Sequence, residues 1–392
     1  MKTATRCVHL EADGDPYGAV SPPIYQTATF RQPTATEFGE YDYTRTANPT
    51  RRLLEQQLAR LEGGAHACAY ASGMAALTAL VRLLGVGDEI IAGNDLYGGT
   101  VRLLGQILPR QGIKVSYVET TDLAAVRQAI TPNTKLILIE TPTNPLLRIS
   151  DINALARLAR DAGALLAVDN SMLSPCFQQP LALGADIVIH SATKYLCGHS
   201  DVTAGALVTN DPQLSEQIAF QQNAEGAGLS PFESWLLLRG MKTLALRVER
   251  QNATAQVIAS FLSEHPAVEK VYYPGLTGHA GHELHRAQAT GDGSVISFTT
   301  GNVSLSERLV SAAKLFTIAV SFGAVGSVIS LPCRMSHASI PQTLKESLAP
   351  PPDLVRLSVG IEDVDDLIDD LNQAFEVAIE RRADAVLAGC AR

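Results

Sequence analysis

Short apolar runs alternate with amphipathic helical segments between about residue 66 and residue 210. Strands are expected over 66–70, 89–92, 114–118, 135–140, 165–169, 186–190 and 205–208. Helices are expected between these runs, for example over 75–84 and 152–162. Strands that are apolar on both faces and separated by helices predict an α/β fold, with a mostly parallel seven-stranded sheet covered on both sides.

Two segments flank this region. Residues 1–46 are rich in Thr, Pro and Tyr and have little periodicity, so they are predicted to form an extended arm. Apolar residues at helical spacing follow over 52–61, before a pair of glycines at 63 and 64. We therefore expect the larger domain to span residues 47–245.

The C-terminal part of the chain predicts a smaller α/β domain over residues 246–392. A long helical pattern from Ser230 to Phe261 is expected to link the two domains. Beyond it, strands are expected over 268–273, 294–299, 319–320 and 355–359, with a closing helix over 363–378.

Composition narrows the possible partners. A chain of 392 residues with 46% hydrophobic and 18% charged residues is typical of a well-packed globular protein with two domains. The net charge of −9, without a stripe of Lys and Arg, argues against a nucleic-acid or anionic-membrane partner. An acidic balance still allows a local basic pocket for a phosphate or a carboxylate.

The location is predicted to be cytoplasmic. The N-terminus has no apolar core of a signal peptide, and Arg82 interrupts the longest apolar stretch well before it reaches membrane-spanning length. The six cysteines show no CxxC spacing and are interpreted as free thiols in a reducing compartment: Cys7, Cys68, Cys176, Cys197, Cys333 and Cys390.

Several expected strands end in polar residues. Ser72 and Gly73 follow one strand, Asn144 lies just after another, and Asp169 and Ser191 stand at the ends of two more. In open α/β sheets ligands bind outside the carboxyl ends of the strands. These residues are therefore expected to converge on one crevice.

Lys194 is the leading candidate for covalent chemistry. Ser191 and Thr193 precede it and could share one face of an extended segment, where their hydroxyls suit a phosphate. A lysine among apolar neighbours has a lowered pKa and can form a Schiff base with an aldehyde cofactor. Taken alone, such a lysine is more often a surface residue.

Two further sites suit a flat, phosphorylated cofactor. Asp169 could hold a protonated ring nitrogen and make the ring an electron sink, although an N-cap or ion-pair role is equally open. Gly73 and Met74 begin a helix whose backbone N–H groups would face an anion. A simple helix cap is the alternative for this pair.

Four other residues are candidates on weaker grounds. Tyr97 could stack on a planar cofactor, and Tyr43 with Arg45 could bind a phosphate, in a neighbouring subunit because they lie on the arm. Arg356 could form a bidentate contact with a substrate carboxylate. Each would otherwise be an ordinary surface or ion-pair residue.

Two patterns are set aside. His279, His282 and His285 mimic metal spacing, but the glycines between them and the lack of a cysteine partner favour a polar loop and a helix start, so no metal is expected. Gly73, Gly98 and Gly99 form no dinucleotide or NTP motif.

With these residues in view, the chain resembles the pyridoxal-phosphate enzymes of cysteine–methionine transsulfuration. The resembling stretches run nearly from end to end: residues 4–6, 43–45, 72–76, 97–99, 140–145, 168–170, 191–195 and 356–360. The resemblance implies an aspartate-aminotransferase-like fold of type I and pyridoxal 5′-phosphate as cofactor. It also implies a homotetramer of two active dimers.

The resemblance also implies residue roles. Lys194 would be the Schiff-base lysine and Asp169 the partner of the pyridinium nitrogen. The phosphate would be held by Ser191, Thr193, Gly73 and Met74, with Tyr43 and Arg45 from the adjacent subunit. Tyr97 would stack on the ring and assist catalysis, and the substrate carboxylate would be held by Asn144, Ser321 and Arg356.

Within this family the C-terminal half resembles the plant-like β-lyase branch, over residues 222–232, 321–325 and 332–341. The implied reaction is β-elimination of L-cystathionine to homocysteine, pyruvate and ammonia. Gly326 stands where γ-specific branches usually carry Glu, and Gly99 where methionine γ-lyases tend to carry Cys. γ-Synthase or γ-lyase activity is the alternative, and a non-catalytic scaffold of the same fold a remote one.

Overall fold

The computed structural model describes residues 1–10, 15, 17–338, 340 and 348–390, with side chains as far as Glu380. Three expectations fall outside this part of the chain: the free thiol of Cys390, and the resemblance at Ser339 and Pro341.

The larger sheet has seven strands in the order β1-β7-β6-β5-β4-β2-β3. Their bounds are β1 (His66–Tyr70), β2 (Glu89–Gly93), β3 (Lys114–Val118), β4 (Thr134–Glu140), β5 (Leu165–Asp169), β6 (Ile187–His190) and β7 (Gly205–Thr209). β7 is antiparallel to both of its neighbours, and the other pairs are parallel. The predicted α/β class and the mostly parallel sheet are confirmed, and every expected strand is correct to within one residue at each end.

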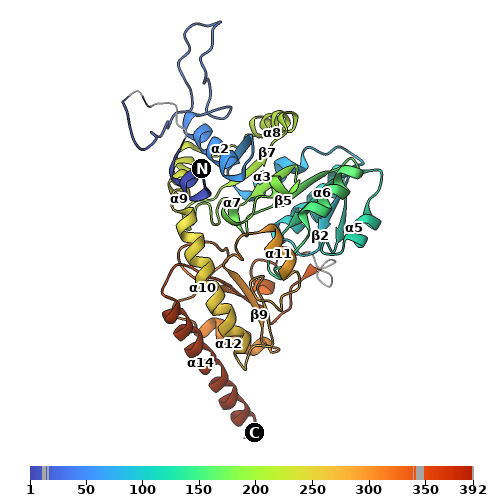
Figure 1. Cartoon of the computed structure of the whole chain (residues 1–392), viewed down its shortest axis with the longest axis vertical. Helices are drawn as coiled ribbons and strands as arrows, with labels where there is room; N and C mark the ends of the chain where they lie inside the picture. Colours follow the sequence, from blue (N-terminus) through green and yellow to red (C-terminus); the bar gives the residue numbers. More distant parts are fainter. Residues whose placement is uncertain (11–14, 16, 339, 341–347, 391–392) are drawn as a thin grey trace.

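Helices cover both faces of this sheet because its strands are apolar on both sides (Figure 1). Ile187 and Ile189 of β6 belong to the apolar cluster of one face, whereas Val188 packs with Ala59 on the other. The helices of this part of the chain are α2 (Pro49–Glu62), α3 (Gly73–Val81), α4 (Gly98–Arg102), α5 (Leu123–Ala129), α6 (Ile152–Asp161), α7 (Ser174–Phe177) and α8 (Pro212–Glu225).

The helix expected over 75–84 begins two residues earlier, as α3. Ser72 is its N-cap, and the side-chain hydroxyl accepts a hydrogen bond from the N–H of Ala75 at 3.1 Å. The cap brings Gly73 and Met74 into the first turn, directly after β1. The start of α3 therefore lies at the carboxyl edge of the sheet.

The helical pattern from Ser230 to Phe261 forms two helices rather than one, α9 (Pro231–Met241) and α10 (Leu244–Glu264). The Arg247 side chain donates to the carbonyl of Gly240 at 2.9 Å and to the hydroxyl of Thr243 at 3.1 Å. Because the guanidinium takes a carbonyl that would otherwise continue the helix, the chain turns at Lys242 and Thr243.

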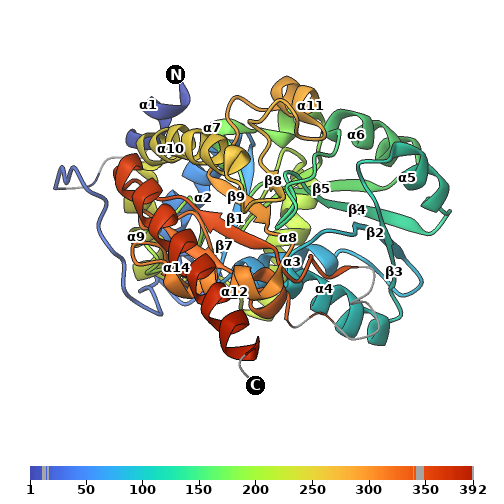
Figure 2. The same ribbon diagram turned by 90° about the horizontal axis from the view of Figure 1, so that it is seen from below.

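A second sheet has five strands in the order β10-β11-β12-β9-β8. They are β8 (Lys270–Tyr272), β9 (Val295–Thr299), β10 (Thr317–Ile318), β11 (Val328–Ser330) and β12 (Val355–Ser358). Helices α10, α12 (Val303–Ala312) and α14 (Val364–Cys390) share an apolar cluster with this sheet, and α14 crosses it in the view from below (Figure 2). α11 (His282–Gln288) lies between the two sheets in Figure 1.

Two strand predictions in this part of the chain need correction. The strand expected over 319–320 is instead β10, which ends at Ile318 because the chain then turns toward Ser321, a residue with φ of +83°. β11 was not predicted, since three residues are too few for a recognisable alternation.

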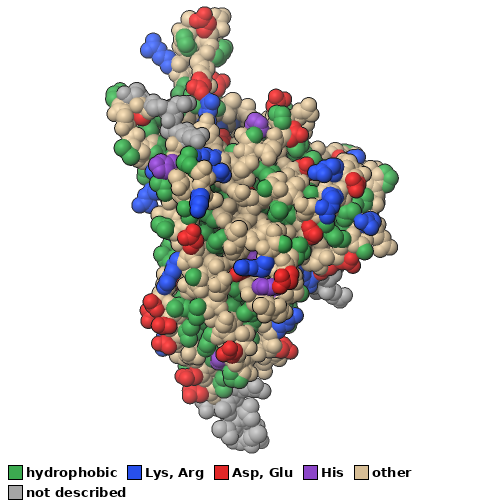
Figure 3. Space-filling model, in the orientation of Figure 1, with side chains coloured by type: hydrophobic (Ala, Val, Ile, Leu, Met, Phe, Trp, Pro, Cys, Tyr) green, Lys and Arg blue, Asp and Glu red, His purple; other side chains and the backbone are tan. Residues whose placement is uncertain are grey.

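The N-terminal segment divides into two parts. Residues Thr3–Val8 form a short helix, α1, whose Cys7 is buried with residues of α2 and α10, so this helix packs against the body of the molecule. Residues 17–42 protrude as extended loops (Figures 1 and 3). Tyr17, Val20 and Phe38 on these loops are 95%, 100% and 70% exposed.

No helix in the described residues is both long and apolar enough to cross a membrane. Cys7, Cys68, Cys176, Cys197 and Cys333 are free thiols.

Candidate active site

A cavity of about 440 Å³ lies between the carboxyl edge of the larger sheet and the segments around Ser321 and β12. Ten of the residues predicted from the sequence line it: Gly73, Met74, Tyr97, Asn144, Asp169, Ser191, Thr193, Lys194, Ser321 and Arg356. The polar residues at the strand ends therefore do converge on one cavity, as expected. Tyr43 and Arg45 do not line this cavity.

The amine of Lys194 is buried in the wall of the cavity. Its Nζ donates to the Ser321 hydroxyl at 2.7 Å and lies 5.0 Å from the centre of the Phe322 ring. Burial lowers the pKa of Lys194 to about 8, helped by the charge of Arg356 and opposed by nearby carboxylates. About a tenth of this amine is therefore neutral, and nucleophilic, at pH 7.

Ser321 joins Lys194 to the second sheet. Its backbone has φ of +83°, a left-handed conformation that costs energy for a residue with a side chain. In this conformation the hydroxyl meets Lys194, while the backbone carbonyl accepts a hydrogen bond from Arg356 Nη2 at 2.8 Å. The strained residue thus places the amine and the guanidinium in the same cavity.

Arg356, on β12, is buried and has no carboxylate ion-pair partner among the described residues. Its Nη1 donates to the side-chain oxygen of Asn144 at 2.8 Å, and its Nε has no hydrogen-bond partner. Burial lowers the pKa of Arg356 to about 10. A buried cation with free donor capacity is suited to receive a carboxylate.

A chain of short hydrogen bonds fixes Asp169 at the end of β5. Asp169 Oδ1 accepts from the N–H of Ser171 at 2.9 Å, and the Ser171 hydroxyl accepts from the N–H of Ser191 at 2.6 Å. Burial raises the pKa of Asp169. A buried carboxylate at this position would gain from a cationic partner, such as a protonated ring nitrogen.

Glu140 lines the same cavity, and the sequence reasoning gave it no role. It ends β4 and is buried, and its carboxylate accepts from the N–H of Tyr97 at 3.4 Å. Burial and the charge of Asp169 hold the pKa of Glu140 well above its ordinary value. The rule that strands end at the site would have identified it, because Glu140 ends an expected strand.

The start of α3 lies directly against Ser191. A Cβ added at Gly73 would come within 2.9 Å of the Ser191 Cβ and 3.0 Å of its Cα, so only glycine fits there without a shift. The first N–H groups of the helix have no partner within the helix and point with its dipole toward the cavity. The Thr193 hydroxyl is oriented by the N–H of Ala204 at 2.9 Å.

The cavity fits a flat cofactor that carries an aldehyde and a phosphate. A Cβ at Gly99 would come within 3.0 Å of the Tyr97 ring and 3.1 Å of the Met74 sulfur, so glycine leaves Tyr97, 41% exposed, free to occupy the cavity wall. The Lys194 amine, the Asp169 carboxylate and the start of α3 beside the Ser191 and Thr193 hydroxyls supply the groups that such a cofactor needs.

Tyr43 and Arg45 lie together at the base of the protruding arm. Arg45 Nη1 donates to the backbone and side-chain oxygens of Asn223, at 2.8 and 2.6 Å, and its guanidinium lies 5.5 Å from the Tyr43 ring centre. Within one chain they are apart from Lys194. Their expected service to a neighbouring subunit stays a prediction.

The histidines at 279, 282 and 285 do not gather around a common point. His282 Nδ1 contacts the Pro274 carbonyl at 2.7 Å, and His285 Nε2 contacts the Gly291 carbonyl at 3.0 Å. In the part of the chain that the structure describes, no group of three or more His, Cys, Asp or Glu could hold a metal ion.

Comparison with known proteins gives a consistent result. Residues 4–376 match the family described as Cys/Met metabolism PLP-dependent enzyme. The chain is 55% identical to the chloroplastic cystathionine β-lyase of Arabidopsis thaliana, over 95% of this chain and 80% of that protein. It is 51% identical to the cystathionine γ-lyase of Bacillus subtilis, over 96% of this chain and 100% of that one. The solved cystathionine γ-lyase of Lactobacillus plantarum, complexed with L-serine, superposes with a TM-score of 0.94 at 46% identity, over 96% of this chain and 99% of that chain.

Proposed function

Because the chain belongs to the pyridoxal-phosphate-dependent enzymes of cysteine and methionine metabolism, we propose that it is a carbon–sulfur lyase acting on L-cystathionine. The reaction is β-elimination, which releases homocysteine, pyruvate and ammonia. The observation that carries the proposal is the buried Lys194 amine, held by Ser321 in one cavity with Asp169 and Arg356.

Pyridoxal 5′-phosphate, when bound, supplies an electron-withdrawing ring that acidifies the Cα proton of an attached amino acid. Lys194 would hold the cofactor covalently through Nζ, and Asp169 would keep the ring nitrogen charged. The phosphate is held by Ser191 and Thr193 with the N–H groups of Gly73 and Met74.

Tyr97, which lines the cavity beside Gly99, would stack on the ring. Arg356 receives the α-carboxylate of the substrate, with Asn144 and Ser321 orienting the guanidinium through the bonds described above. These contacts place Cα of the substrate near Lys194.

Lys194 then moves the protons. Because burial lowers the pKa of Lys194 to about 8, more of the free amine is neutral near neutral pH than for an ordinary lysine, and this neutral form accepts the Cα proton as a general base. It returns a proton to the departing sulfur as the Cβ–S bond breaks, with help from the Tyr97 hydroxyl. One residue therefore serves first as base and then as acid.

Gly326 favours β- over γ-chemistry in this proposal. Among the residues that the structure describes, nothing lies within 4 Å of the place that a Cβ would take there, and the position supplies no carboxylate for the distal ammonium of a long substrate. γ-Elimination or γ-replacement is the alternative, supported by the similarity to the Bacillus subtilis γ-lyase.

The assembly belongs to the same proposal. The exposed apolar residues of the arm suit a neighbouring subunit, into whose cavity Tyr43 and Arg45 would reach to hold the phosphate. The complete enzyme is then a cytoplasmic homotetramer of two active dimers. The arm, larger domain and smaller domain would span about residues 1–46, 47–245 and 246–392.

A product assay tests the reaction. With L-cystathionine, β-elimination yields pyruvate and homocysteine, whereas 2-oxobutyrate and cysteine would show γ-elimination and overturn the proposal. Acylated homoserine with cysteine tests γ-synthase activity in parallel. In Lys194→Ala we expect product formation to fall by about 10³-fold or more. When the imine is reduced with borohydride before denaturation, the unmodified enzyme should keep the cofactor covalently and Lys194→Ala should not. Covalent retention by this variant would disprove the role of Lys194.

A further inference from the structure

We propose that Arg51 is a positioning residue for the phosphate end of the site in the neighbouring subunit. It acts by holding the turn that carries Tyr43 and Arg45. The inference rests on the proposed function, in which these two residues reach the partner's cofactor, and adds the residue that fixes them.

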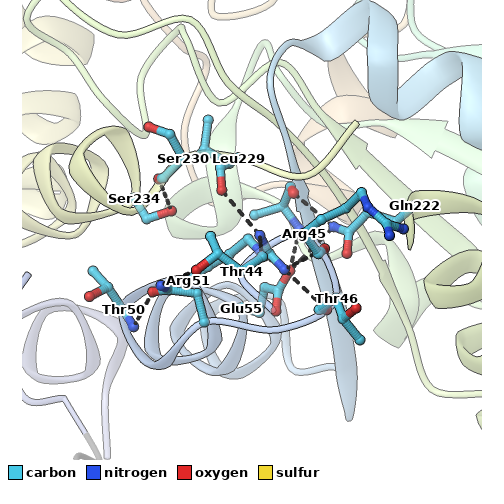
Figure 4. Close-up of polar contacts among 12 residues, drawn as sticks. Thr44, Arg45, Thr46, Thr50, Arg51, Glu55, Gln222, Leu229, Ser230 and Ser234 are labelled. Atoms are coloured by element: carbon cyan, nitrogen blue, oxygen red, sulfur yellow. Dashed lines mark hydrogen bonds and ion pairs between the residues drawn. The ribbon is translucent and has the colours of Figure 1, made fainter. Parts of the chain in front are cut away.

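Arg51 lies on α2 and is 2% exposed, so its charge is removed from water within its own chain. The guanidinium points at the turn formed by Thr44, Arg45 and Thr46 (Figure 4). Nη1 donates to the Thr44 carbonyl at 2.8 Å, and Nη2 donates to the carbonyls of Arg45 and Thr46, both at 3.1 Å. One cation therefore ties down three consecutive carbonyls.

Arginine suits this task better than lysine. A guanidinium offers five N–H donors in a planar fork, while an ammonium offers three around a point. Hydrogen bonds from a charged group are also stronger than neutral ones. The buried guanidinium of Arg51 donates through Nη1 and Nη2 to main-chain carbonyls. It therefore fixes the backbone conformation of the turn and is not simply one half of an ion pair.

The turn has a second attachment through its own side chains. Arg45 is bound to Asn223 near the end of α8, and the Thr46 hydroxyl lies 3.4 Å from the Asn223 side-chain oxygen. Arg51 fixes the backbone of this turn from within, and Asn223 fixes the side chain from outside. If Arg51 is lost, the carbonyls of the turn lose their common donor and Tyr43 and Arg45 lose their fixed direction.

Arg51 also borders a segment that leads to the site of its own chain. Its Nη1 donates to the Leu229 carbonyl at 3.4 Å, and its Nε lies 3.7 Å from Glu55, which accepts from the N–H of Ala69 in β1. β1 continues into Ser72 and Gly73. An effect of Arg51 could thus be exerted on the partner's site or on its own, and a test must separate the two.

Hybrid oligomers make this separation. Arg51→Met and Lys194→Ala chains with two different affinity tags are expressed together, and doubly tagged oligomers are isolated. We expect Arg51→Met alone to bind pyridoxal phosphate about 10-fold more weakly or worse. In an active dimer that contains both chains, the site with an intact Lys194 receives an arm with an intact Arg51, so wild-type affinity and turnover should return at one site of each such dimer.

The Arg51→Met chain keeps its own defective β1 contacts in this hybrid. Affinity that stays as weak as in Arg51→Met alone would show that Arg51 acts on its own site and would overturn the inference. Unchanged affinity in Arg51→Met itself would overturn it too. Arg51→Lys should be intermediate, and it carries the same hybrid test if Arg51→Met fails to fold.

Two controls complete the design. Arg82→Met removes an arginine that pairs with Glu225 at 2.8 Å on the surface, and it should leave cofactor affinity unchanged. Arg45→Ala paired with Lys194→Ala tests the arm itself. Restoration with Arg45→Ala but not with Arg51→Met would refute the role of Arg51 and leave the proposed function intact. If neither hybrid recovers cofactor affinity, the arm does not reach the partner's site. The product assay would still test the proposed β-elimination independently.

Discussion

At the scale of single residues, the burial of one amine has a measurable consequence. Lys194 has a pKa of about 8 against an ordinary value of 10.5, because burial disfavours the charged form. The amine is mostly protonated below pH 8 and mostly neutral above it. Only the neutral form attacks the aldehyde of the cofactor.

We therefore expect the rate at which the cofactor-free enzyme captures pyridoxal phosphate to rise about tenfold per pH unit below pH 8, and to level off above it. Stopped-flow absorbance at limiting cofactor measures this rate. A simple lysine derivative, treated in the same way, should keep accelerating toward its higher pKa. A protein profile that also climbs without a plateau would show that Lys194 is not perturbed.

Sequence reasoning worked well for residues that end strands. Asp169, Asn144 and Ser191 could be placed together because parallel strands share a carboxyl edge. Glu140 was not given a role although the same rule applies to it. Phe322, which lies beneath both Lys194 and Arg356, could not be assigned, because its contact depends on a long-range approach of two sheets.

At the scale of elements, the junction of β7 with the start of α3 is closely packed. A Cβ at Gly205, the first residue of β7, would lie 2.6 Å from the carbonyl carbon of Ser72 and 2.8 Å from the Cα of Gly73. These are backbone atoms, so the new methyl group cannot be avoided by a change of rotamer. The end of β1 and the start of α3 would have to move.

Gly205→Ala should lower the free energy of unfolding of the cofactor-free protein by about 1–3 kcal/mol, as overpacking typically does. It should also weaken cofactor binding, because the start of α3 moves. Denaturant unfolding and a cofactor titration measure the two effects. Gly278→Ala is the matched control, since nothing lies within 4 Å of its Cβ. Equal stability of the two variants would contradict the close packing at Gly205.

The elements themselves were predictable where the pattern was long or the strand buried on both faces. β1 and β5 were predicted to the residue, because their flanks change abruptly to polar residues and glycine. The turn between α9 and α10 was not predicted, since the side chain of Arg247 causes it from the next helix. β11, with three residues, is defined only by its neighbours in the sheet.

At the scale of the whole molecule, Arg356 joins the two sheets across the cavity. It belongs to β12 of the smaller sheet and donates to Asn144, which follows β4 of the larger one. The distance between the sheets is therefore coupled to the position of the guanidinium. A substrate carboxylate that binds Arg356 would be held by both parts of the molecule at once.

Arg356→Lys should lower kcat/KM by about 10- to 100-fold, chiefly through a higher KM, because an ammonium cannot hold Asn144, Ser321 and a carboxylate together. The visible absorbance of the bound cofactor should be retained, since Lys194 and Asp169 are untouched. Steady-state kinetics measures the loss of substrate binding, and an absorbance spectrum of each preparation shows whether the cofactor is still bound. Loss of the cofactor band would instead assign Arg356 to cofactor binding.

The contribution of the arm could not be derived from the pattern of one chain. The exposed side chains of Tyr17 and Phe38 fit the neighbouring subunit that we propose, but only the resemblance to a family suggests what Tyr43 and Arg45 would do there. Physical reasoning on a single sequence describes contacts within the chain. In a site shared between two chains, the contacts that residues such as Tyr43 and Arg45 make within their own chain do not explain their position in the sequence.

Gly326 has an evolutionary consequence. Since open space surrounds the position where its side chain would begin, a substitution there meets no packed neighbour at its first atom. A lineage could therefore vary the charge at this position without first losing the folded state. Relatives named as β-lyases and γ-lyases resemble this chain to nearly the same degree, at 55% and 51% identity. Selection for a particular substrate would then limit the divergence between β- and γ-elimination. The stability of the fold would not limit it.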